Sequence, residues 1–122
     1  MEQIPLFERL GGRDAIQAVV EKTLANHFVN PVIKTRYEHA AMSRQQMIEH
    51  ATEFFCTGLS GVNTYPGRPL VEAHAGMNVT DEEFCAVLDD IVDALDSQGI
   101  RDPERSEVLG ILYSMKPEVV RL

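Results

Sequence analysis

The chain has 122 residues, of which 44% are hydrophobic and 25% are charged, a balance typical of an ordinary globular protein. Its net charge of −8 argues against binding to nucleic acid or to an anionic membrane surface, because both need a basic face. No apolar run approaches the roughly 20 residues that cross a bilayer, and the first residues lack the pattern of a secretory signal. Cys56 and Cys85 are too few for a disulfide framework, so both are expected to be buried thiols. We therefore expect a single domain, residues 1–122, in the reducing cytoplasm.

Helical spacing of the apolar residues dominates the first half of the chain. Gly11-Gly12 predicts a break between a short N-terminal helix and a longer one over residues 14–28. A second long helix is predicted over residues 43–59, because Ser43 is a good N-cap and Ser60-Gly61 is a good stop. These breaks predict separate helices rather than one long rod.

The second half shows the same periodicity. Residues 62–69 contain glycine and prolines and predict a loop. Thr80 and Glu83 have the spacing of a capping box, which predicts a helix that continues to Gly99. Pro103 opens a last helix, which is expected to bury Val108, Leu109, Ile111, Leu112 and Met115. Since no stretch alternates like a strand, the predicted class is all-α, with five or six helices.

One of the four histidines, His74, has a distinctive setting. It lies in a short segment, residues 70–76, among small side chains that would let a flat group approach the backbone. An apolar slot with one neutral imidazole is what reversible ligand binding at haem iron requires. The predicted walls of such a slot are Phe54, Phe55, Leu70, Val79 and Phe84. From periodicity alone these residues could equally pack against one another in an ordinary core.

Several motifs in the right order resemble one protein family. They are the string LFERLGGRDAIQAVVEK over residues 6–22, the Phe54-Phe55 pair and the block YPGRPLVEAHAGMNVTDEEF over residues 65–84. The A-H-x-G-x-x-V-T pattern at residues 73–80 is the most specific of them. Together these motifs resemble the group I truncated haemoglobins over nearly the whole chain. The resemblance implies a two-over-two helical sandwich around haem b.

The resemblance also implies roles for individual residues. His74 matches the proximal histidine that binds the iron, and the five predicted wall residues match positions that contact haem. Tyr65 and Arg68 lie in the loop where this family approaches a haem propionate, and a guanidinium pairs well with a carboxylate. A solvated cation is the alternative for Arg68. Tyr37 matches the position whose side chain wedges the haem edge, and it follows Arg36, where the family is usually apolar.

The distal side departs from the family pattern. Leu24 and Ala51 match positions where relatives often carry a tyrosine and a glutamine that hydrogen-bond to bound oxygen. Each missing hydrogen bond is worth roughly 1–2 kcal/mol, so bound oxygen is expected to dissociate faster. This departure argues against the oxygen-dependent removal of nitric oxide that the family performs.

His50 is the candidate distal iron ligand. It lies one turn before Phe54, at a position where some cyanobacterial and algal relatives carry a side chain that binds the iron. In the alternative, His50 points outward and pairs with a propionate or with solvent. Met47, one turn earlier, is a weaker candidate for a ligand and is expected to be a wall of the pocket.

Other polar side chains are expected at the surface. An exposed position is expected for His27, although it lies close enough to Leu24 to touch the pocket, and His39 is expected in a solvated loop. The acidic residues of the third long helix have surface spacing and are interpreted as a solvated face rather than a metal site. They are Asp89, Asp90, Asp93 and Asp96.

The resulting hypothesis is a haem protein that reversibly binds O2, CO or NO, in oxygen binding or transport, sensing, scavenging or redox protection. One alternative is a haem redox enzyme acting on nitric oxide or nitrite with an external reductase as electron donor. Another is a globin-fold interaction module without haem. The chain offers no reductase domain and no evident acid–base pair, which favours a ligand-binding protein over an enzyme.

Overall fold

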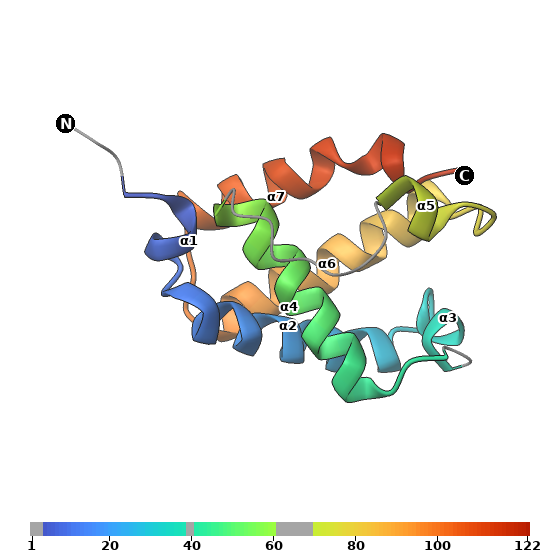
Figure 1. Ribbon diagram of the computed structural model, residues 1–122, viewed down its shortest axis with the longest axis horizontal. Helices are drawn as coiled ribbons and strands as arrows, with labels where there is room; N and C mark the ends of the chain where they lie inside the picture. The colour runs from blue at the N-terminus through green and yellow to red at the C-terminus, as the bar shows by residue number, and fades with distance from the viewer. Residues whose placement is uncertain (1–3, 39–40, 61–69) are drawn as a thin grey trace.

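The protein is a bundle of α-helices, described here by a computed structural model over residues 4–38, 41–60 and 70–122 (Figure 1). In chain order the helices are α1 (Leu6–Arg9), α2 (Gly12–Val29), α3 (Lys34–Glu38), α4 (Arg44–Ser60), α5 (Leu70–His74), α6 (Asp81–Ser97), α7 (Glu104–Ser114) and a 3-10 turn, η1 (Lys116–Glu118). This part of the chain contains no strand, only an isolated bridge between Val79 and Val120. The all-α class is thus confirmed, and the short helices α3 and α5 account for the excess over the expected number.

Local capping sets where the two middle helices begin. The Thr80 hydroxyl accepts a hydrogen bond from the Glu83 backbone N–H, and the Glu83 carboxylate accepts one from the Thr80 N–H, each at 3.1 Å. This capping box starts α6 as predicted. Ser43 and Gln46 make the same reciprocal pair before α4, at 3.1 and 2.9 Å. Each pair satisfies two backbone N–H donors that would otherwise lack partners at a helix start.

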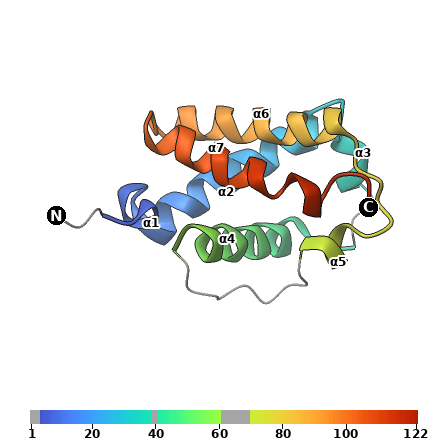
Figure 2. The same cartoon turned by 90° about the horizontal axis from the view of Figure 1, so that it is seen from above.

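The long helices form two crossed layers. Helix α2 packs against both α4 and α6, and α6 packs against α7. Figure 2 shows α6 and α7 on one side of the molecule and α4 with α5 on the other. The buried core, which includes Ile16, Val20 and Leu95, lies where α2 crosses its neighbours. This arrangement is the predicted two-over-two sandwich.

Two predictions about burial are wrong. Cys85 is exposed, because its neighbours Phe84 and Ala86 take the buried positions on α6; Cys56 is buried as predicted. The last helix buries Val108 fully, whereas the other apolar residues of its predicted buried set are only half-buried. Two of these, Leu112 and Met115, line a cavity, and Leu112 also packs against the core. Within the described residues no helix is both long and apolar enough to span a membrane.

Candidate functional site

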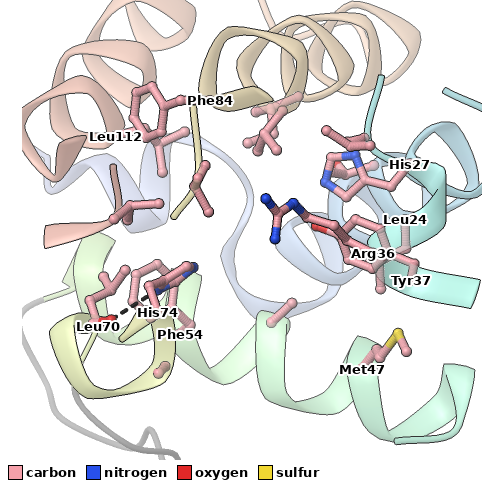
Figure 3. A pocket seen from close by; sticks show the side chains of 18 of the residues that line it. Leu24, His27, Arg36, Tyr37, Met47, Phe54, Leu70, His74, Phe84 and Leu112 are labelled. Carbon is pink, nitrogen blue, oxygen red and sulfur yellow. Dashed lines mark hydrogen bonds between the residues drawn. The ribbon is translucent and has the colours of Figure 1, made fainter. Parts of the chain in front are cut away.

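A large cavity of about 360 Å³ lies among helices α2, α3, α4, α5, α6 and α7 (Figure 3). This volume is within the range of pockets that hold small molecules and cofactors. All the predicted site residues in the described part of the chain line this cavity. They are Leu24, Tyr37, Met47, His50, Phe54, Phe55, Leu70, His74, Val79 and Phe84. The predicted propionate contacts Tyr65 and Arg68 lie outside the described residues, as does His39.

His74 is oriented by the backbone of its own helix. It is the last residue of α5, and its Nδ1 lies 2.9 Å from the carbonyl oxygen of Leu70. Because a carbonyl oxygen only accepts, Nδ1 is the donor in this hydrogen bond, and Nε2 is the ring nitrogen left for a metal ion. Figure 3 shows this hydrogen bond on one side of the ring and the other nitrogen on the side of the cavity. A neutral imidazole held through Nδ1 is the usual arrangement of a histidine that binds a metal ion through Nε2.

The mouth of the cavity carries an ion pair. Met42 and Met77 line the cavity and are exposed, so the cavity meets solvent beside them. Between them, Arg36 of α3 donates hydrogen bonds to both carboxylate oxygens of Glu83 and, at 3.2 Å, to the carbonyl oxygen of Met77. These bonds, with the Thr80 N–H bond, lower the pKa of Glu83 from its ordinary 4.5 to about 2. Arg36 therefore joins α3 to α6 across the rim.

This ion pair predicts a pH-dependent stability. The pKa of Glu83 is lower in the folded protein, so its contribution is fully present above pH 4.5 and is lost as the pH falls toward about 2. Arg36→Met should lower the free energy of unfolding by about 1–2 kcal/mol at neutral pH and by little at the acid end. Denaturant unfolding of both proteins across that pH range measures the difference. An equal loss at every pH would mean that the Arg36 side chain acts through packing alone.

His27 is buried, so its expected exposed position is wrong. Its exposed fraction is 4%, it lines the cavity, and its Nδ1 lies 2.7 Å from Oδ2 of Asp90 on α6. Its ring also stacks on Tyr37, with centroids 5.2 Å apart. The helical pattern did contain a signal, because His27 extends the buried stripe of Val20 and Leu24 by one turn.

Asp90 likewise departs from the solvated acidic face, since its side chain is only 14% exposed. Both its carboxylate oxygens accept hydrogen bonds from the Asn30 amide, at 3.1 Å. Asp89, Asp93 and Asp96 are exposed as expected. No group of three side chains of metal-binding type comes together in the described residues.

Neither Leu24 nor Ala51 can donate a hydrogen bond from its side chain, and both line the cavity. The α2 wall nevertheless contains polar atoms. The Thr23 hydroxyl is buried there without a hydrogen-bond partner among the described residues, one turn before His27. The sequence analysis did not single out Thr23 and His27 as polar groups of the cavity wall. It considered only Leu24 and Ala51, the positions where relatives often carry hydrogen-bonding side chains.

Comparison with known proteins identifies the family of this chain. A family model described as a bacterial-like globin matches residues 5–121. A group 1 truncated haemoglobin of Tetrahymena thermophila is 33% identical over 106 residues, covering 83% of this chain and 82% of that protein. The chain belongs to the group 1 truncated haemoglobins of the bacterial-like globin family. The resemblance seen in the sequence motifs is thereby confirmed.

Further relatives agree with this placement of the globin. A group 1 truncated haemoglobin of Mycolicibacterium paratuberculosis is 28% identical over 118 residues, 97% of this chain and 85% of that protein. A crystal structure of the truncated haemoglobin of Tetrahymena pyriformis, in its Fe(III) form, superposes with a TM-score of 0.91. That likeness covers 98% of this chain and 100% of the other at 24% identity, so it supports the fold.

Membership of a globin family implies haem, and the cavity fits this group. A macrocycle with an apolar body needs apolar walls, which the aromatic and aliphatic lining supplies. Its iron needs an imidazole nitrogen, which Nε2 of His74 would supply. Its charged edge needs an open side with cations, and the cavity meets solvent at the rim where Arg36 lies. This globin is therefore a haem-binding protein.

Proposed function

We propose that this globin holds haem b through His74 and reversibly binds small diatomic ligands such as O2, CO and NO, in sensing, scavenging or redox protection. The observation that carries the proposal is the hydrogen bond from His74 Nδ1 to the Leu70 carbonyl. It leaves Nε2 as the nitrogen available to iron in a histidine that lines an apolar cavity. The bound haem would supply an iron atom with one open or exchangeable position for a gas.

The other lining residues would keep this site dry and in place. Phe54, Leu70 and Phe84 come from α4, α5 and α6, so the walls that would face the macrocycle belong to three separate helices. Tyr37 of α3 would lie at the haem edge, packed against Phe28 and His27. Arg36 at the rim, with Tyr65 and Arg68, would face the propionates.

His50 is proposed as the second iron ligand when no gas is bound. It lines the cavity from α4, whereas His74 lines it from α5. An imidazole is a good axial ligand for haem iron, and a gas would have to displace it before binding. Ligand binding would then depend on the opening of the bond between His50 and iron, and the resting protein would be suited to electron transfer with an external reductase.

The cytoplasmic location stays a prediction from the sequence.

Haemin titration of the purified protein tests the proposed function. We expect a Soret band that rises until one haem is bound per chain, followed by the spectral changes of CO binding after reduction. The apolar cavity of about 360 Å³ with His74 on its wall is the physical reason. A chain that remains helical by circular dichroism and yet binds no haemin would contradict the proposal and favour an interaction module.

A further inference from the structure

His27 and Asp90 form a buried dyad at the cavity wall. The imidazole projects from α2, and the carboxylate comes from α6, where Asn30 holds both its oxygens. Asn26 fixes the same turn of α6 through hydrogen bonds to the Asp90 carbonyl and to Asp93, each at 3.0 Å. Asp90 thus accepts hydrogen bonds from His27 and Asn26 of α2 and from Asn30, which follows that helix.

The hydrogen bond decides which nitrogen of His27 is available. A carboxylate oxygen only accepts, so His27 Nδ1 carries the hydrogen. Nε2 then keeps its lone pair, and no described residue hydrogen-bonds to it. Burial lowers the pKa of His27 below its ordinary 6.5, although the Asp90 bond raises it in part. His27 is therefore neutral at pH 7, with a basic nitrogen in a residue that lines the cavity.

The charges around His27 favour the uptake of one proton. From α3, Tyr37 stacks on the ring and Arg36 lies in the same cavity. The Arg36 charge is already matched by Glu83. From α4, His50 faces the same space. Asp90 has no cationic partner other than His27 among the described residues, so a proton on Nε2 would complete a buried ion pair.

Figure 3 places His27 and His74 on different sides of the cavity. A ligand that binds iron opposite His74 would therefore occupy the space that His27 also lines. Resting on the proposed function, we propose that His27 is the proton acceptor for weakly acidic ligands HX, such as hydrogen cyanide or hydrogen sulfide, that bind at this site as the anion X⁻.

The proton step is balanced and needs no reductant or oxidant. The H–X bond breaks, X keeps the electron pair, and the proton goes to His27 Nε2, which becomes an imidazolium paired with Asp90. His27 would be the residue that contacts the ligand, and Asp90 would be a positioning residue that also stabilises the new charge. The acid–base pair that was not evident in the sequence is thus supplied by two helices.

The test compares a protic ligand with an aprotic one in the haem-loaded protein. We expect His27→Gln, which keeps a donor toward Asp90, to slow cyanide association with the ferric protein about 100-fold relative to CO association with the ferrous protein. Asp90→Asn should lower the ratio of cyanide association to CO association about tenfold. His27 would keep a hydrogen-bond partner in this variant but would lose the negative charge that stabilises its protonated form. In the wild type, cyanide association should slow as the pH falls through the pKa of His27, which burial places below 6.5, and in His27→Gln this dependence should disappear.

Thr52→Val is the matched control, because it removes a buried hydroxyl that likewise has no hydrogen-bond partner among the described residues but does not line the cavity. It should leave the ratio unchanged. The inference is overturned if His27→Gln slows both ligands equally, if it leaves cyanide unaffected, or if it abolishes a low-spin ferric spectrum, which would make His27 an iron ligand. A protein without a Soret band contradicts the proposed function itself, whereas an unchanged ratio in haem-loaded protein contradicts only the role of His27.

Discussion

His74→Gly should release haem at least about 100-fold faster than the wild type, since losing even an outer partner of a metal ligand costs 10–100-fold. The removed imidazole is the one that Leu70 holds with Nε2 as the nitrogen available to iron. Haem loss is measured as transfer to an excess of a haem-acceptor protein. Added imidazole should fill the space left by the side chain and restore both the Soret band and slow haem loss.

Val71→Ala is the matched control for this variant. Val71 lies on the same short helix, but it is 47% exposed and does not line the cavity. Its replacement should therefore leave haem loss unchanged. If His74→Gly retains haem as well as this control does, with no effect of imidazole, then another side chain holds the iron.

His50→Ala should convert the resting spectrum from low spin to high spin and raise the CO association rate at least about tenfold. The reason is that, in the wild type, His50 would leave the gas site open less than about a tenth of the time. CO association with the wild type would be slowed by the same factor. Because His50 lines the cavity from α4, its truncation frees the space a gas needs. Absorption spectra without gas and flash photolysis of the CO complex give the two quantities.

Met47→Leu separates His50 from the alternative ligand one turn earlier on α4. Met47 lines the same cavity, and leucine keeps its bulk without the thioether sulfur. We expect this variant to keep a low-spin spectrum. A high-spin spectrum in Met47→Leu, or an unchanged one in His50→Ala, would show that His50 is not the sixth ligand.

Features that depend on neighbouring residues were predictable from the sequence. The start of α6 follows from Thr80 and Glu83, three residues apart, because a capping box needs only one turn of chain. The long helices follow from apolar spacing, and the sites of His74 and Phe54 follow from ordered motifs that resemble the family. The short helices were less evident, because four or five residues carry too little periodicity.

Contacts between distant segments were decided only by the tertiary structure. His27 and Asp90 are 63 residues apart, and Arg36 and Glu83 are 47 apart. Read locally, each of these residues is polar and fits an exposed helical face. Burial became favourable only when the crossing of α2 and α6 gave His27 a carboxylate partner, since an unpaired polar group in the interior is costly. The sequence by itself thus determined the long helices and singled out His74 as the proposed iron ligand, whereas the packing of distant helices decided which polar groups share its cavity.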